Sequence, residues 1–356
     1  MKNILSCLML VMLFTGSLFA QSPSLKGLED ITCTAVKSQG RTGTCWSFST
    51  ISFLESEIIR MGFDEIDLSE MYIVRHIYFD KAQNYYLRQG KANFSQGSLS
   101  HDVINVIEKY GVVPEKNYPG RTADTPHDHE ALEKELKELL DAEIKSKDKS
   151  PYWMTKVNKV LDKHLGALPR EVDALGYASF NGLNPEAYMS FTSFNHHPKY
   201  KSFILEIPDN YSNGSYMNVE LEDLRSIVDY ALANGYTVSW DGDVSENGFR
   251  AKEGLAVLSN DEVISLDNEY RETRVDDNLR QDQFMTYVTT DDHLMHIVGR
   301  VKDNMGRTYY KVKNSWGEIG PFAGYLYMSE AYFDMKTVGI MVNTMAVPET
   351  LKRKFK

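Results

Sequence analysis

The segment from Gln39 to Ser49, with the sequence QGRTGTCWSFS, constrains the fold of this chain more than any other. Its glycines indicate a turn, and apolar residues recur behind the turn at helical spacing: Phe48, Ile51, Leu54, Ile58 and Met61. We expect Thr44 to cap this helix with its side chain, which places Cys45 in the first turn. The helix dipole favours an anion there, and the thiolate is the nucleophilic form of cysteine.

Two motifs near the other end of the chain indicate what such a cysteine could do. His293 stands in the segment DHLMHIVG, and Asn314 follows 21 residues later in the segment NSWG. A cysteine at a helix start, a distant histidine and a distant asparagine are the parts of a thiolate–imidazolium nucleophile with an orienting amide. Each residue alone is more simply structural. The catalytic interpretation therefore depends on their combination and order, with Gln39 six residues before Cys45.

With these residues in this order, the chain resembles the papain-like cysteine peptidases. The matching features are Gln39, Cys45 with Trp46, His293 with Gly299 six residues on, and the NSWG segment. A closer likeness to the bleomycin hydrolase and aminopeptidase C branch rests on five segments: RTGTCW, TSFNHHP (192–198), IPDN (207–210), NGYTVSWDGDVS (234–245) and DHLM (292–295). The likeness covers almost the whole chain after residue 25. It implies an α+β fold of two lobes with the active site in the groove between them.

Periodicity and resemblance together predict where these lobes lie. Residues 21–356 form the peptidase domain, with a helical lobe at about 25–120 that carries Cys45. Residues 121–235 form a helical insertion and a connecting region, in which Glu130–Lys145 and Trp153–Leu165 are amphipathic helices. Strand-like segments at about 236–345 predict an antiparallel, barrel-like β lobe that carries His293 and Asn314.

The resemblance assigns a role to each of these residues. Cys45 would attack the peptide carbonyl, His293 would hold the proton as an imidazolium, and Asn314 would orient its ring. Gln39 and the backbone N–H of Cys45 would donate to the oxyanion, and water would then hydrolyse the acyl-enzyme. We choose His293 over His296 because Gly299 follows it at the family's interval, and because alternation along a strand puts the two histidines on opposite faces.

The substrate groove is expected to contain Gly97, Ser98 and Trp316. Gly97 aligns with the family segment that hydrogen-bonds the substrate backbone, and Ser98 stands where a second glycine is usual, which would narrow this subsite. Trp316 is expected to shield the hydrogen bond between His293 and Asn314. The adjacent His196 and His197 do not predict a metal site, because they point in different directions and have no third ligand at a typical spacing. No cofactor is expected.

Composition and the first residues bear on partners and location. The formal net charge of −11 disfavours a nucleic-acid partner. Residues 1–20 have a basic start, a short apolar run and a small-residue end, so they predict a signal peptide with export to the periplasm or the extracellular space. A retained membrane anchor is the alternative, but the run is shorter than a span needs. The mature enzyme would then have no stable membrane insertion.

Removal of the signal peptide would leave two cysteines, Cys33 and Cys45. Pairing them would consume the nucleophile, so no structural disulfide is expected. Cys33 then serves as a small buried hydrophobe or as a reversible redox partner of Cys45.

Substrate choice stays open at the level of sequence. The resembled branch trims peptides from their N-termini because a C-terminal tail blocks its cleft, whereas this chain stops at PETLKRKFK (348–356). It is therefore either an aminopeptidase blocked in another way, for example by the helical insertion, or an open-cleft endopeptidase. A catalytically silent peptide-binding module is a third interpretation. The branch also forms hexameric rings, so the resemblance implies a homo-oligomer, although no ring contact can be read from the sequence.

Overall fold

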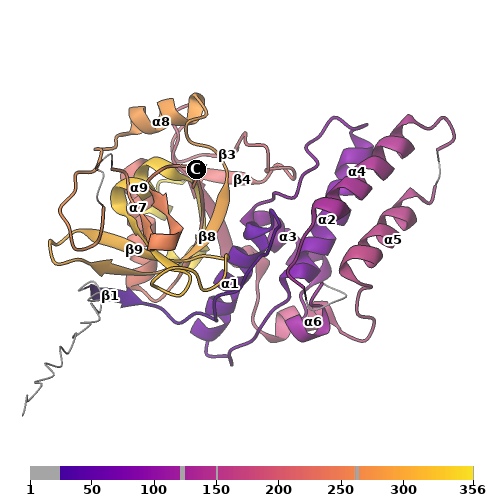
Figure 1. Ribbon diagram of the computed structural model, residues 1–356, viewed down its shortest axis with the longest axis horizontal. Coiled ribbons are helices and arrows are strands. Elements are labelled where there is room, and N and C mark those ends of the chain that lie inside the picture. Colours follow the sequence, from indigo (N-terminus) through magenta and orange to yellow (C-terminus); the bar gives the residue numbers. More distant parts are fainter. Residues whose placement is uncertain (1–24, 121–124, 150, 260, 262–263, 356) are drawn as a thin grey trace, which may run out of the picture.

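A computed structural model describes residues 25–120, 125–149, 151–259, 261 and 264–355 of the chain. A group of helices stands beside a large sheet, and helix α1 lies where the two meet (Figure 1). The predicted signal peptide, residues 1–20, lies outside the described residues. Within the described part, no helix has both the length and the apolar character that crossing a membrane requires.

The helical part is built around α1, which is buried at every position from Cys45 to Ile58. Its apolar side chains share one core with those of the helices that follow. These helices are α1 (Cys45–Arg60), α2 (Glu70–Leu87), α3 (Ser100–Tyr110), α4 (Glu130–Lys145), α5 (Trp153–Leu165) and α6 (Ala174–Phe180), with short 3₁₀ turns at Glu115–Asn117 and Pro185–Ala187. The two predicted amphipathic helices are confirmed as α4 and α5, which pack together and against α2 (Figure 1).

The second part is one mixed sheet in the described residues. Its strands are β1 (Lys26–Asp30), β2 (Tyr188–Thr192), β3 (Ser202–Ile204), β4 (Ser215–Asn218), β5 (Val238–Gly242), β6 (Phe249–Arg250), β7 (Leu255–Ala256), β8 (His293–Lys302), β9 (Thr308–Lys313), β10 (Tyr325–Ser329) and β11 (Thr337–Asn343). Their order is β3-β4-β2-β11-β5-β8-β9-β10-β7-β6, with β1 beside β8, and all pairs are antiparallel except β2–β4 and β7–β10. The α+β class is thus confirmed. The two end strands, β3 and β6, do not pair with each other in the described residues, so the sheet does not show the predicted barrel-like closure.

Two regions differ from the sequence-based outline. Strands β2, β3 and β4 come from the region expected to be only a helical insertion and connection, yet they extend the sheet through β11. They are three to five residues long and lie among polar turns, so alternation gives little signal. Helix α8 (Asp277–Met285) was also missed, because its residues are mostly polar and only one of them, Arg280, is buried.

The remaining helices pack on the face of the sheet away from α1. These are α7 (Leu221–Ala233), α9 (Glu330–Lys336) and α10 (Glu349–Lys352), with 3₁₀ turns at Ala251–Glu253 and Thr344–Ala346. Met295 and Ile297 of β8 join the core that α7 and α9 cover, whereas Leu294 joins the core of α1. Because β8 packs against α1, its first residue, His293, comes close to the beginning of that helix.

Candidate active site

An open cleft of about 480 Å³ lies at the N-terminus of α1, between the helical part and the sheet. Cys45 and His293 both line it, although 247 residues separate them in the chain. The other predicted residues that line the cleft are Gln39, Gly97, Ser98 and Trp316. The fold therefore brings side chains from the beginning, the middle and the end of the chain to one groove.

Cys45 is the first residue of α1 and is buried. The predicted cap is wrong: the Thr44 side chain makes no capping hydrogen bond and instead contacts the Thr42 hydroxyl, with the two oxygens 2.6 Å apart. The backbone N–H groups of the first turn are thus not capped by that side chain, and they direct the positive end of the helix dipole toward the sulfur. A hydrogen bond from the Leu294 backbone also favours the thiolate.

His293 is held by Asn314 in the manner of a catalytic base. Its Nε2 lies 2.8 Å from Asn314 Oδ1, which also accepts a hydrogen bond from the Ser315 backbone at 2.7 Å. Because an amide oxygen can only accept, Nε2 must carry the proton of this hydrogen bond. In the neutral ring Nδ1 is therefore the nitrogen that can accept a proton. The Trp316 ring lies with its centroid 4.8 Å from that of His293 and covers this arrangement.

His296 has a different environment from His293. It is fully buried, its Nδ1 lies 2.9 Å from the Ser52 hydroxyl of α1, and its ring packs edge-on against Phe53. Burial, followed by the charge of Lys313, holds its pKa well below the ordinary value. His296 does not line the cleft, whereas His293 does. The two histidines therefore lie on opposite faces of the strand, as its alternation predicts.

Gln39 is oriented by its neighbours on both sides. Its Oε1 accepts a hydrogen bond from the Ser315 hydroxyl at 2.6 Å, and its Nε2 donates to the Thr42 carbonyl at 2.6 Å. The second N–H of this amide is not used in these contacts, and the residue lines the cleft beside Cys45. The preceding turn is fixed by Gly40, which has φ +66° and whose missing Cβ would lie 2.4 Å from the His127 carbonyl.

Burial sets the protonation of the two reactive groups. It raises the pKa of the Cys45 thiol to about 12, with the carboxylates of Asp291 and Asp241 adding to the rise. Burial also lowers the pKa of His293 to about 4, against the opposing hydrogen bond with Asn314. Each group taken alone therefore favours its neutral form, whereas the sequence predicted a resting ion pair.

The space in front of Gly97 is occupied by the chain itself. A Cβ at this position would lie 1.7 Å from Oδ2 of Asp209, so the glycine admits that carboxylate. The Gly97 carbonyl accepts a hydrogen bond from buried Lys81. The Ser98 hydroxyl donates a hydrogen bond to Asp102 at 2.7 Å, and the residue lines the cleft.

Carboxylates form one wall of the cleft, and no local pattern in the sequence predicts this wall. Asp209, Asp291 and Asp292 line it, and Asp241 lies behind Asp291 on β5. Asp241 is 4% exposed, and no N–H or O–H of the described residues hydrogen-bonds either of its oxygens or Oδ2 of Asp291. Burial, followed by the charge of Asp291, raises the pKa of Asp241 well above its ordinary value. The pKa of Asp291 is raised to about 7, first by burial and then by the charge of Asp209.

The last described residues lie away from the cleft. Leu351 of α10 is buried in the core beneath α7, the Phe355 ring lies 5.7 Å from that of Phe191, and Lys354 Nζ lies 3.0 Å from Asp223. No described residue after Trp316 lines the cleft. Cys33 does not line the cleft either, and its sulfur contacts the Tyr325 hydroxyl at 3.3 Å.

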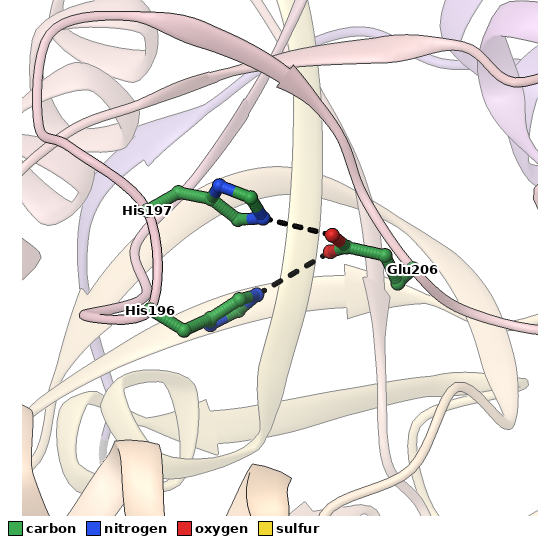
Figure 2. Close-up of side chains that lie close together, drawn as sticks. All are labelled: His196, His197 and Glu206. Carbon is green, nitrogen blue, oxygen red and sulfur yellow. Dashed lines mark hydrogen bonds and ion pairs between the residues drawn. The ribbon is translucent and has the colours of Figure 1, made fainter.

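Outside the cleft, His196 and His197 point their Nε2 atoms at the same carboxylate, that of Glu206 (Figure 2). The expectation from the sequence that the two rings point in different directions is wrong. A third ligand was sought only at helical or finger-like spacings, whereas Glu206 stands nine residues after His197. Glu206 follows β3, which returns the chain to the turn that carries the two histidines.

Comparison with known proteins places the chain in a family. Residues 170–356 match the Peptidase C1-like family, and residues 26–179 match the papain family of cysteine proteases. The chain belongs to the Peptidase C1-like family. It is a papain-like cysteine peptidase of the aminopeptidase C and bleomycin hydrolase branch, as the resemblance predicted.

Relatives of known activity share about a quarter of their residues with this chain. Aminopeptidase C of Lactobacillus helveticus is 24% identical over 89% of this chain and 81% of its own length. Bleomycin hydrolase of Mus musculus is 24% identical over 88% of this chain and 81% of its own length. The crystal structure of PepW from Lactobacillus rhamnosis superposes with a TM-score of 0.74 at 18% identity, over 92% of this chain and 84% of that one, and so shows the shared fold.

Proposed function

We propose that this peptidase is an aminopeptidase in which Cys45 is the nucleophile and His293 the base. The observation that carries the proposal is that Cys45, His293 and a wall of carboxylates line one cleft. The names of the relatives, aminopeptidase C and bleomycin hydrolase, point the same way. The residue roles rest on the geometry described above.

In this proposal the thiol proton of Cys45 moves to His293 Nδ1 as sulfur attacks the peptide carbonyl. Attraction between the resulting thiolate and imidazolium offsets the cost that burial sets on each charge alone. Asn314 engages Nε2, which leaves Nδ1 as the ring nitrogen that can take the proton from the sulfur. Gln39 Nε2 and the Cys45 backbone N–H donate to the developing oxyanion, and each such donor typically contributes ~3 kcal/mol. The imidazolium then protonates the leaving amine, and water hydrolyses the acyl-enzyme.

The carboxylate wall would select the N-terminal residue of the substrate. A free peptide N-terminus carries an ammonium with three N–H donors, and the buried oxygen of Asp291 has no donor in the described residues. Lys81 lies nearby and attracts Asp209, but its ammonium is engaged by the Ser95 and Gly97 carbonyls. A substrate ammonium at Asp291 would therefore meet a partly uncompensated negative charge.

Two experiments test the role of Cys45 as the nucleophile and the preference for a free N-terminus. Alkylation of Cys45 by iodoacetamide, mapped by mass spectrometry, should remove activity in proportion to labelling, whereas labelling of Cys33 should not. Peptides that differ only in N-terminal acetylation should separate exopeptidase from endopeptidase action, since the proposal requires release of the first residue from the free-amine form. Cleavage of acetylated peptides at interior bonds with equal kcat/KM would establish the endopeptidase instead.

Export and assembly are also proposed. Export to the periplasm or the extracellular space rests on the sequence of residues 1–20. N-terminal sequencing of the protein secreted by its host would test it, with a mature end at Gln21 as the expected result. A homo-oligomer rests on resemblance to the branch, and light scattering of the purified protein would show a monomer mass if this idea is wrong.

A further inference from the structure

We propose that His196, His197 and Glu206 form a binding site for a divalent transition-metal ion, with Zn²⁺ as the ion that suits them. The three side chains converge on a single point, as Figure 2 shows. This site is separate from Cys45 and His293, and the proposal does not depend on how the peptidase works.

The donor atoms are already spaced for one ion. His197 Nε2 lies 2.8 Å from Glu206 Oε1, and His196 Nε2 lies 3.4 Å from Oε2. One ligand atom from each residue can be chosen so that all lie within 4.8 Å of one another. Two ligands that each sit about 2.1 Å from a tetrahedral ion are about 3.4 Å apart, so small side-chain rotations would complete the site.

The surroundings hold both rings in place before any ion binds. The His197 ring stacks on Phe203 with centroids 4.1 Å apart, and the His196 ring lies nearly parallel to Phe284 at 5.7 Å. Gln281 of α8 places its side-chain nitrogen 3.1 Å and its oxygen 3.5 Å from His196 Nδ1. The Gln281 oxygen is fixed by a hydrogen bond from the Asn195 backbone N–H and can accept the Nδ1 proton without turning, which is the supporting contact that metal-bound histidines usually have.

The chemistry of the donors selects the class of ion. Two imidazole nitrogens and one carboxylate suit Zn²⁺ and its transition-metal neighbours, whereas Mg²⁺ and Ca²⁺ prefer sites built of oxygen. The Glu206 side chain is 60% exposed, which gives an ion a path from solvent and leaves room for a water ligand.

The site joins two segments that matter for the cleft. The histidines lie in the turn between β2 and β3, and Glu206 stands three residues before Asp209, which lines the cleft. His196 and Glu206 also border an apolar pocket of about 370 Å³ that Asp291 lines as well. A bound ion would therefore fix the segment that carries Asp209 to the turn of the two histidines, and it should stabilise the folded chain.

Calorimetric titration with Zn²⁺ tests the proposal on metal-free Cys45→Ala protein, in which the cleft thiol cannot compete. We expect one equivalent to bind and the Tm to rise. His197→Gln and Glu206→Gln should each abolish this binding. Gln281→Ala should weaken it about 10- to 100-fold, the usual effect of losing a supporting hydrogen bond.

The matched control is His164→Gln. His164 Nε2 also lies 2.7 Å from a carboxylate, that of Glu135, but among the described residues this pair belongs to no group of three possible ligands, so Zn²⁺ binding should not change. Far-ultraviolet circular dichroism would show that each variant is folded. Absence of binding at 100-fold excess Zn²⁺, or binding that survives both His197→Gln and Glu206→Gln in folded protein, would overturn the proposal.

Discussion

The Asp291→Asn substitution should remove the preference for a free N-terminus while leaving the chemistry of peptide cleavage in place. Asn keeps the size of the side chain but removes the charge that would face the substrate ammonium. A hydrogen bond to a charged group contributes about 1.5–3 kcal/mol, and each ~1.36 kcal/mol is tenfold in rate. We therefore expect kcat/KM for free-amine peptides to fall about 10- to 150-fold.

The assay compares matched peptides with free and acetylated N-termini, for the wild type and for Asp291→Asn. Acetylated peptides carry no ammonium, so the kcat/KM of their slower cleavage should change by less than about threefold. A change of this size is within the context dependence of a single contact. Asp148→Asn makes the same charge change at an exposed carboxylate that does not line the cleft, and it should leave both values unchanged. An equal fall for both peptides with Asp291→Asn, or no fall at all, would refute the role given to the carboxylate wall.

The remaining predictions concern the site geometry and its ionisation. Asn314→Ala should lower kcat about 10- to 100-fold with little change in KM, because it frees the His293 ring. A rise in KM alone, measured by steady-state kinetics, would contradict this role of Asn314. Gly97→Ala should push Asp209 aside and reduce cleavage of free-amine peptides more than of acetylated ones. The raised pKa of Asp291 costs stability progressively as pH rises from about 4 through 7, so urea unfolding should show Asp291→Asn gaining on the wild type between pH 4 and pH 8. The lowered pKa of His293 works in the opposite sense, and its contribution to stability should be lost as pH falls from about 6.5 to 4.

The parts of the site that the sequence could predict are those with a fixed local pattern. Cys45 follows a glycine turn and opens an apolar helix, and His293 and Asn314 stand in short motifs at a set interval. These patterns led to the family, which the comparisons confirm. The amphipathic helices α4 and α5 were predicted for the same reason, because a regular apolar stripe survives in the sequence alone.

The carboxylate wall could not be predicted because its members share no local pattern. Asp209 comes from the loop after β3, Asp241 from β5 and Asp291 from the segment before β8. Only the antiparallel register, in which Asp241 pairs with Leu294, brings the last two together. Glu206 was missed for a similar reason, since strand β3 must form before it faces His196 and His197. At Thr44 a local pattern led to a wrong prediction. Its side chain contacts the Thr42 hydroxyl instead of capping the helix, so this contact overrides the preference of threonine for the N-cap position.

In the proposed mechanism the sulfur of residue 45 performs the reaction. The most direct test is steady-state hydrolysis of one free-amine peptide by the wild type, by Cys45→Ala and by Cys33→Ala. We predict that Cys45→Ala lowers kcat by roughly a million-fold, the scale seen when the nucleophile of a serine triad is removed, and that Cys33→Ala keeps wild-type turnover. Turnover by folded Cys45→Ala at a rate near that of the wild type would contradict the account.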